Sequence, residues 1–465
     1  MRPVATTAQL RAAEEKAFAE QPGIDLMSTA AEAVVAVARV VAPNGSVVVA
    51  VGPGNNGGDG LYAAATLAAD RQVLIWLAMG TGHEEGLARA LDAGCREVDA
   101  VEAMESLEDA SLVVDAVLGI GGRAGLPAEL AIFAEAAESL GVPVLAVDLP
   151  SGLDADSGDA HTSFRADCTV TFAAPKPCHV IGEASELCGD IVVADIGVAV
   201  GDTGIEVAEE SDIARWWPVP GPHSHKYTRG VVGLDIGSAN YPGAALLGCA
   251  GALHAGPGMV RYVGDAPETL ILTRFPSIVM AGGRVQAMVL GSGWGDLHDA
   301  GERLRAAIDS GVPLVLDADA LSLLPVDLPK GSLLTPHAGE LARLLCVDRD
   351  EVEADPICYA KRAAARFGAT VLLKGGTQYV ATPSGDVTIV VRGPAWTGQA
   401  GSGDTLAGAC GTLLAAGVGA KRAAILAASL QAITARRHPG PHPPDVLASF
   451  FPAAIANMVN VNSRR

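Results

Sequence analysis

A glycine-rich stretch near the N-terminus constrains the fold of this chain more than any other segment. Residues 52–60 read Gly-Pro-Gly-Asn-Asn-Gly-Gly-Asp-Gly; they follow the apolar run 47–51 and precede a helical pattern over 61–69. A strand, a glycine-rich turn and a helix in this order point backbone N–H groups at an anion. Two asparagines and an aspartate are more polar groups than a phosphate cradle needs, so we expect chemistry or ion coordination at this turn.

The turn formally matches the dinucleotide-binding pattern G-x-G-x-x-G through Gly52, Gly54 and Gly57. That fingerprint also requires an acidic residue at the end of the second strand, about 20 residues further on. The next predicted strand, 73–79, ends in Met-Gly-Thr-Gly without a carboxylate. We therefore set an ordinary dehydrogenase aside, and a tight turn without any ligand is the remaining structural alternative.

Apolar β-type runs alternate with helical patterns in both halves of the chain. This alternation predicts an α/β protein with two three-layer αβα domains around mostly parallel sheets. The length of 465 residues exceeds that of one ordinary domain. Three prolines within five residues interrupt the pattern near 218–222. We expect domains at 1–208 and 223–465, joined by a linker at 209–222.

The expected strands of the first domain are 47–51, 73–79, 112–117, 142–148, 168–173 and 191–195. Those of the second are 231–236, 259–263, 287–290, 313–317, 332–334, 370–374, 378–381 and 387–391, the last two forming a hairpin.

Charge and cysteine usage exclude several classes of protein. A net charge of −21 argues against nucleic acid as the main partner. The eight cysteines form no C-x-x-C pair and have no metal-ligand spacing, which predicts inert thiols in a reducing compartment. Because we find neither a signal-peptide core nor an apolar run of membrane-spanning length, we expect a cytoplasmic protein without a membrane partner.

Carboxylates end two further strands of the first half, at Asp115 and Asp148. Ligands of parallel sheets bind at the carboxyl ends of strands, so we expect these two and Asp59 to converge on one crevice. The oxygens of Asn56, Asp115 and Ser151 would suit a cation without transition-metal character, and a carboxylate there could move a proton. The alternative is that the strand-end aspartates only cap the strands.

The Asn-Asn-Gly-Gly-Asp turn at 55–59 and the Asp-Leu-Pro-Ser-Gly segment at 148–152 resemble the YjeF-type N-terminal domain, the NAD(P)H-hydrate (NAD(P)HX) epimerase. The resemblance covers about 1–208 and implies a Rossmann-like fold. The residues that it assigns to the hydrated nucleotide are Asn55, Asn56, Gly57, Gly58, Asp59, Gly119, Ile120, Gly121, Gly122, Arg123, Ala124, Gly125 and Asp148.

The same resemblance implies a potassium ion on Asn56, Asp115 and Ser151. It places Asp148 at the damaged nicotinamide ring, and we expect Asp148 or Asp115 to assist the proton transfers.

A second glycine cluster surrounds Asp404 in the segment Gly398–Gly408. The backbone N–H groups of 401–404 would form an anion hole at the start of a helix. Asp404 is placed to act as a base on a hydroxyl group that attacks phosphate. A capped helix start would explain Asp404 but not the glycines, and the chain contains no Walker A sequence.

With this segment, the second half of the chain resembles the ribokinase-type fold and, more narrowly, the ADP-dependent NAD(P)HX dehydratase. The resemblance covers 223 to about 450. The other matching motifs are His225-Lys226 with Gly230, Gly237-Ser238, Tyr241–Ala245, Leu290–Gly293, Leu316–Leu321, Thr335–Glu340 and Leu373–Gly376. The resemblance assigns to the hydrated nucleotide Ala245, Gly293, His337 and Asp404. It assigns to the adenine nucleotide Lys374, Gly375, Gly376, Thr377, Gln378 and Gly403.

Together these resemblances imply repair of hydrated NADH and NADPH. One domain would interconvert the R and S epimers of NADHX and NADPHX. The other would use Asp404 to phosphorylate the S epimer from ADP as co-substrate; loss of phosphate then restores NAD(P)H and leaves AMP and phosphate. Magnesium is expected to screen the phosphates, and we expect a homo-oligomer.

Two alternatives of other classes stay open. A kinase of a small hydroxylated metabolite would share Asp404 and would release a stable phosphorylated product. The second alternative is a non-enzymatic RNA-binding module. A filter-binding assay with RNA at two salt concentrations would distinguish it from an enzyme.

Overall fold

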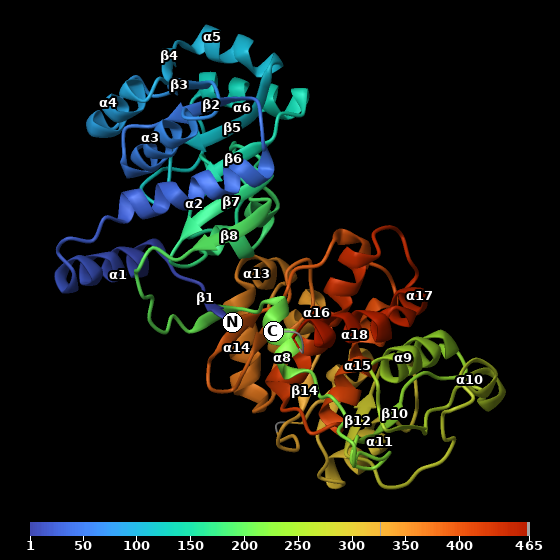
Figure 1. The fold of residues 1–465 in the computed structure, drawn as a ribbon. Coiled ribbons are helices and arrows are strands. Elements are labelled where there is room, and N and C mark those ends of the chain that lie inside the picture. The colour runs from blue at the N-terminus through green and yellow to red at the C-terminus, as the bar shows by residue number, and fades with distance from the viewer. Residues whose placement is uncertain (326, 463–465) are drawn as a thin grey trace. The chain divides into compact units, whose positions relative to one another are not determined.

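The computed structural model describes residues 1–325 and 327–462, without the side chains of 460–462, and it divides into two compact units. One unit spans Arg2–Thr203, and the other spans Gly204–Arg465 together with Met1 (Figure 1). Residues of the expected linker cluster with the second unit, because α8 (Glu210–Trp216) packs against α16 and α18 there. The expected domain boundaries, 1–208 and 223–465, stay a prediction.

The first unit contains a seven-stranded sheet whose strands all run parallel, in the order β4-β3-β2-β5-β6-β7-β8. The strands are β2 (Ser46–Val51), β3 (Val73–Leu77), β4 (Arg96–Val98), β5 (Ala110–Ala116), β6 (Val144–Val147), β7 (Cys168–Phe172) and β8 (Asp190–Ala194), besides the short β1 (Arg2–Pro3). The helices are α1 (Thr7–Glu20), α2 (Leu26–Val41), α3 (Asn55–Leu67), α4 (Glu84–Asp92), α5 (Ala100–Glu105), α6 (Ala128–Leu140) and α7 (Pro177–Val180).

Alternation along β2 explains the three layers of this unit. Val47, Val49 and Val51 pack with α2 and α3, whereas Val48 and Ala50 pack on the opposite face with α5 and α6. Since successive side chains of a strand point to opposite faces, a strand that is apolar throughout requires helices on both sides. The central strands read this way, which fixes a buried parallel sheet.

The second unit holds the sheet order β9-β17-β16-β15-β14-β13-β12-β10-β11, parallel except for antiparallel β16. Its strands are β9 (Ile205–Val207), β10 (Val231–Asp235), β11 (Met259–Tyr262), β12 (Ala287–Leu290), β13 (Leu314–Leu316), β14 (Leu333–Leu334), β15 (Thr370–Leu373), β16 (Tyr379–Ala381) and β17 (Val387–Ile389). Its helices are α8, α9 (Pro242–His254), α10 (Glu268–Arg274), α11 (Ala300–Asp309), α12 (Ala338–Leu345), α13 (Arg349–Ala354), α14 (Pro356–Phe367), α15 (Ser402–Ala415), α16 (Ala420–Arg437), α17 (Pro444–Ser449) and α18 (Phe451–Asn462).

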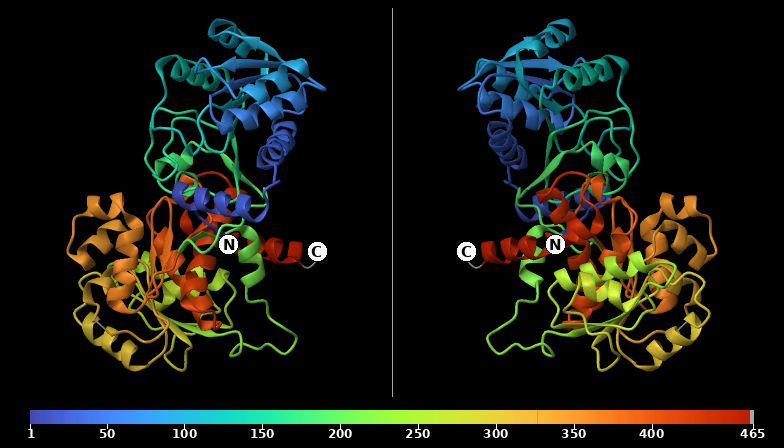
Figure 2. Two further views of the ribbon diagram at one scale, coloured as in Figure 1. Left: turned by 90° about the vertical axis from the view of Figure 1, so that its left-hand side faces the viewer. Right: turned by 90° about the vertical axis from the view of Figure 1, so that its right-hand side faces the viewer.

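Helix α15 forms the centre of the second unit. It packs along α9 and contacts β10, β12 and β13, and from Thr405 to Ala415 every residue is buried. Glycines permit this contact: a Cβ on Gly408 would lie 2.1 Å from the backbone oxygen of Gly248 in α9. Helices cover both sides of the sheet (Figure 2). The small-residue composition therefore serves the close approach of α15 to its neighbours.

The α/β class, the parallel sheets and the hairpin of β16 and β17 are confirmed. Thr6 and Gln9 form a capping box at the start of α1. The expected strands lie where predicted, within a few residues at their ends, but the short strands β1, β4 and β9 were not expected. Six of the eight cysteines are buried, and all eight are free thiols. Among the described residues, no helix is long and apolar enough to cross a membrane.

The expectation that residues 52–60 form one turn is wrong in its second half, because α3 already begins at Asn55. The glycines in this stretch serve close packing rather than turn geometry. A Cβ on Gly57 would lie 2.0 Å from the oxygen of Gly52, and one on Gly60 would lie 2.3 Å from the Cβ of Ala116 in β5. Asn56 and Asp59 are thus fixed on a helix that approaches the sheet closely.

Candidate active sites

A cavity of about 370 Å³ opens in the first unit at the carboxyl ends of its central strands. Helix α1, the start of α3, the segment after β5 and the end of β6 contribute its walls. The polar and charged residues that line it are Arg11, Glu14, Asn55, Asn56, Asp59, Asp148 and Lys176. Strand-end residues meet here as the topology of a parallel sheet predicts.

Asp148 directly follows β6 in a left-handed conformation, with a φ of 69°, which costs a non-glycine residue free energy. Its Oδ2 accepts a hydrogen bond from the backbone nitrogen of Ile120 at 3.0 Å, and the Nζ of Lys176 pairs with its Oδ1. Lys176, only 1% exposed, also donates to the hydroxyl of Thr171 at 2.6 Å. Burial alone would raise the pKa of Asp148, but the Lys176 ammonium holds it below its usual value.

Asp59 lines the same cavity, but its pKa is shifted in the opposite direction to that of Asp148. Burial raises the pKa of its carboxyl to about 8, and the neighbouring charges of Asp148 and Glu14 add to this rise. The pKa of Glu14 is raised as well, by its own burial and then by Asp148. The cavity therefore combines an ionised aspartate with one that keeps its proton near neutral pH.

Asp115 does not line the cavity, contrary to the expected convergence of three aspartates, because it is completely buried. The backbone nitrogen and the hydroxyl of Ser151 donate to its carboxylate at 2.7 Å and 2.5 Å, and the nitrogen of Val117 donates at 3.3 Å. Burial raises its pKa to about 6, against these hydrogen bonds. The Ser151 hydroxyl also accepts from the nitrogen of Leu118 at 2.8 Å, so this pair fixes the segment that follows β5.

Asn56 presents a buried amide group without a hydrogen-bond partner at either atom among the described residues. A Cβ on Gly119 would lie 3.1 Å from its Oδ1 and 2.9 Å from the Oδ2 of Asp148. Unsatisfied buried polar atoms are costly in the absence of a ligand. The amide oxygen of Asn56 is thus available to a bound cation or substrate.

Part of the expected nucleotide set lies on this cavity, namely Asn55, Asn56, Asp59, Gly119, Ile120, Gly121, Gly122 and Asp148. Gly57 and Gly58 are buried inside α3, and Arg123, Ala124 and Gly125 lie outside the cavity lining. The sequence reasoning did not single out Lys176, Glu14 or Arg11. The available signal for Lys176 was a lysine three residues after the predicted strand 168–173.

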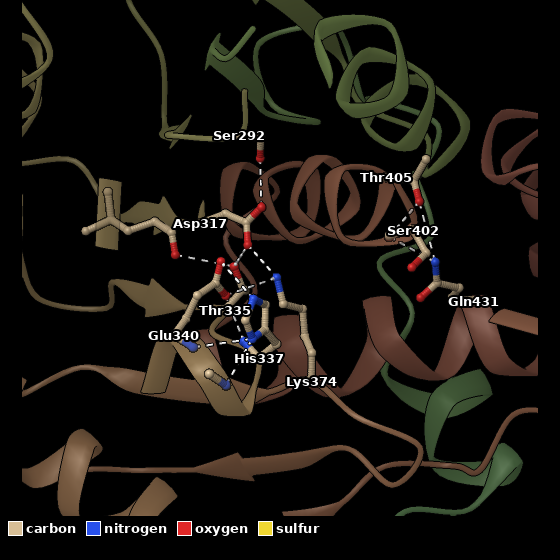
Figure 3. A network of polar contacts seen from close by, with 11 residues as sticks. Ser292, Asp317, Thr335, His337, Glu340, Lys374, Ser402, Thr405 and Gln431 are labelled. Atoms are coloured by element: carbon tan, nitrogen blue, oxygen red, sulfur yellow. Dashed lines mark hydrogen bonds and ion pairs between the residues drawn. The ribbon is translucent and has the colours of Figure 1, made fainter. Parts of the chain in front are cut away.

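In the second unit, Asp404 lies in the first turn of α15. Gly401 caps this helix with a φ of 90°, a left-handed conformation that favours glycine, and a Cβ there would also displace the end of the Leu247 side chain, 2.4 Å away. The amide of Gln431 donates to the backbone oxygen of Ser402 at 3.1 Å (Figure 3). This contact and the packed glycine hold the first turn of α15 in place. The nitrogens of Ser402 and Thr405 already donate to backbone oxygens, at 3.1 Å and 3.3 Å, so the expected anion hole narrows to the other N–H groups at this helix start, such as those of Gly403 and Asp404.

A lysine–aspartate pair lies beside this helix start. Lys374 approaches Asp317 at 2.7 Å, and the hydroxyls of Ser292 and Thr335 donate to the same carboxylate at 2.8 Å and 2.9 Å (Figure 3). A Cβ on Gly403 would lie 3.2 Å from the Nζ of Lys374, which brings the pair against the turn.

The Asp404 carboxyl has a pKa raised to about 7, by burial first and by the charge of Asp317 second, against the attraction of Lys374. A group half ionised at neutral pH is suited to accept a proton there.

His337 caps α12 in the segment after β14. Its Nδ1 accepts hydrogen bonds from the nitrogens of Gly339 and Glu340, at 3.0 Å and 3.3 Å. The side chain remains 54% exposed, and its backbone bridges to Lys374. His337 therefore lies at a helix start, beside the lysine–aspartate pair.

The remaining expected residues differ in their access to a ligand. Gly375 and Gly376 are exposed after β15, and the buried Oε1 of Gln378 has no hydrogen-bond partner in the described part of the chain. Gly293 has a φ of 68° next to α9. Ala245 is fully buried in α9, so its side chain offers no surface to a ligand.

Comparison with known proteins assigns each unit to a family. The family model described as NAD(P)H-hydrate dehydratase matches residues 232–449, and that of the YjeF-related protein N-terminus matches 23–178. The bifunctional NAD(P)H-hydrate repair enzyme Nnr of Mycobacterium leprae is 39% identical over 91% of this chain and 91% of that relative. The Escherichia coli relative of the same name is 32% identical over 84% of this chain and 80% of its own.

A solved structure resembles the second unit. The ADP/ATP-dependent NAD(P)H-hydrate dehydratase of Bacillus subtilis, co-crystallised with ATP and magnesium, covers 55% of this chain and 99% of its own. The two share 26% identity with a TM-score of 0.51.

Proposed function

This chain belongs to the bifunctional NAD(P)H-hydrate repair enzymes, and on that premise we propose that it repairs hydrated NADH and NADPH with one activity in each unit. The first unit interconverts the R and S epimers. The second converts the S epimer to NAD(P)H at the expense of ADP, leaving AMP and phosphate. The observation that carries this proposal is the presence, in one chain, of two separate sites that each hold an aspartate whose pKa is raised by partial or full burial.

The dehydratase step follows from the start of α15. Asp404 accepts the proton of the ring hydroxyl, and the hydroxyl oxygen attacks the terminal phosphorus of ADP. N–H groups in the first turn of α15 stabilise the charge on the transferred phosphoryl group, and Lys374, whose Nζ lies next to Gly403 in this turn, binds the nucleotide phosphates. The bond between the ring carbon and the phosphate oxygen then breaks, and its electrons leave with the phosphate. The adjacent ring carbon loses a proton, and the electrons of that C–H bond restore the double bond.

Magnesium is proposed as a partner of the nucleotide. Among the described residues, no group of three or more His, Cys, Asp or Glu is placed to hold a metal ion. This arrangement fits an ion held mainly by substrate phosphates and water, as magnesium often is. Bound there, the ion would screen the charge of the phosphates.

Potassium is proposed for the first unit. The unsatisfied oxygen of Asn56 supports this, because hard cations take amide, carboxylate and hydroxyl oxygens. The pair of Asp115 and Ser151, already hydrogen-bonded to each other, would supply the remaining side-chain oxygens. We also propose the substrate assignments named above, a homo-oligomer and a cytoplasmic location, which stay predictions.

The test uses the full chain and a mixture of NADHX epimers, followed through the near-ultraviolet absorbance of reduced nicotinamide. Complete recovery of NADH that depends on ADP supports both activities. Recovery that stops at the S-epimer fraction contradicts the epimerase activity of the first unit and leaves the dehydratase activity of the second. No recovery with ADP or ATP contradicts the repair function, and a stable phosphorylated product would favour the metabolite kinase.

A further inference from the structure

The cavity of the first unit holds two aspartates with opposite surroundings. Asp148 is bound to Lys176 and to the nitrogen of Ile120, so both of its oxygens have partners. Asp59 is 9% exposed, and only burial and nearby charges act on its carboxyl. One carboxyl is therefore committed to a cation, and the other faces the cavity without one.

The charged groups around Asp59 come from three elements. Glu14 on α1 and Asp148 after β6 are both acidic, and both disfavour ionisation of Asp59. Arg11 lines the same cavity from α1, and Lys176 is already engaged with Asp148 and a threonine hydroxyl. The electrostatic interaction with His179 also lowers the pKa of Asp148. No cation is thus committed to Asp59 within the described part of the chain.

The chemistry of the proposed substrate needs two such groups. Hydration of a dihydronicotinamide ring is hydration of an enamine, so the hydroxyl is on the carbon next to the ring nitrogen. Inverting that carbon requires one proton for the departing oxygen and removal of one proton from the entering oxygen. Two carboxyl groups whose surroundings drive their pKa values apart are the usual source of such an acid and base.

We propose that Asp59 is the proton donor of the epimerisation and that Asp148, held ionised by Lys176, is the proton acceptor. This assignment rests on the proposed epimerase function and deepens it, because Asp59 otherwise has only a binding role. Lys176 is a positioning residue: it acts through Asp148.

The step balances in atoms and electrons. The C–O bond breaks as the proton of Asp59 passes to the oxygen, which leaves as water, and the nitrogen lone pair forms a C=N bond. A second water forms a C–O bond on the other ring face, its proton passes to Asp148, and the C=N electrons return to nitrogen. Transfer of one proton from Asp148 to Asp59 through water then resets the site.

The experiment compares Asp59→Asn with Asp92→Asn, a matched control on the exposed end of α4. Pure R epimer of NADHX is incubated with the full chain without ADP, and formation of the S epimer above the uncatalysed rate is followed by chromatography. We expect Asp59→Asn to lower kcat by ~10²–10⁴-fold with little change in KM. Asp92→Asn should match the wild type, and both variants should keep the dehydratase rate.

The pH profile of the wild type tests the assignment without any variant. Asp59 donates only while protonated, so kcat/KM should fall above a pH of about 8, and Asp59→Asn should lack this limb. Removing a buried carboxyl whose pKa is raised should also leave the chain no less stable at pH 8, which thermal unfolding checks.

Epimerisation by Asp59→Asn at the wild-type rate, with the same fall at high pH, overturns the assignment and leaves the proposed function intact. A wild-type profile without the high-pH limb overturns it too. If the wild type does not interconvert the epimers, the proposed epimerase function fails, and the assignment fails with it.

Discussion

The dehydratase rate should follow the ionisation of Asp404. Its pKa of about 7 means that about a tenth of the carboxyl is ionised at pH 6 and about nine tenths at pH 8, so kcat should rise about tenfold between them. An aspartate at its ordinary value of 3.8 would give a flat profile over this range. Asp404→Asn, which removes the base, should lower kcat by ~10²–10⁴-fold at pH 8.

The same burial makes a prediction about stability with the opposite sign. A carboxyl whose pKa rises on folding favours the folded state below its unfolded value, and that advantage is lost as pH rises toward about 7. The rise from 3.8 to about 7 corresponds to at most about 4 kcal/mol. Asp404→Asn should therefore leave the second unit equally or more resistant to urea at pH 8.

The assay uses S-NADHX with saturating ADP from pH 6 to 8. Asp309→Asn, at the exposed end of α11, is the matched control for lost charge, and epimerisation in the first unit is the internal control. A flat wild-type profile, or Asp404→Asn within tenfold of the wild type, would refute Asp404 as the base. A marked loss of urea resistance in Asp404→Asn would refute the sign of the burial effect.

Three further perturbations test the surroundings of the two sites. Lys374→Met leaves Asp317 buried and unpaired, so we expect weaker ADP binding by calorimetry and a loss of ~3–5 kcal/mol in urea unfolding. Gly401→Ala would force alanine into a left-handed φ and place its Cβ 2.4 Å from Leu247. We expect the free energy of unfolding in urea to fall by ~1–3 kcal/mol, and dehydration but not epimerisation to slow. Replacing potassium by tetramethylammonium should slow epimerisation in the wild type, and Asn56→Ala should be slow in either salt.

The fold was predictable because its signals are local. Apolar strands such as Val47–Val51 alternate with helical patterns, and the hairpin of β16 and β17 has a clear turn between its strands. The helical start at Asn55 was not predictable from propensity, since glycines disfavour helices. Its reason is tertiary: only residues without a Cβ let α3 approach the backbone of Gly52 and the Cβ of Ala116.

The first site was only partly predictable for the same reason. Strand-end rules indicated Asp148, but its partner Lys176 lies on another segment, and only the folded sheet brings the two together. The same rules placed Asp115 on the crevice, yet its carboxylate is used by Ser151 and lies in the interior. Sequence position locates a strand end but does not say whether the side chain turns toward solvent or toward the core.

The two units arrive at a similar electrostatic arrangement with different residues and different elements. In each, a lysine pairs with one buried aspartate, Asp148 in the first unit and Asp317 in the second. In each, the charge of that paired aspartate is the second cause, after burial, that raises the pKa of an unpaired one, Asp59 or Asp404. The charge of the paired carboxylate thus adds to the effect of burial in raising the pKa of its neighbour toward neutral pH. Because this effect needs only proximity in a poorly solvated site, it can arise independently of sequence order, and both proposed reactions move protons near neutral pH.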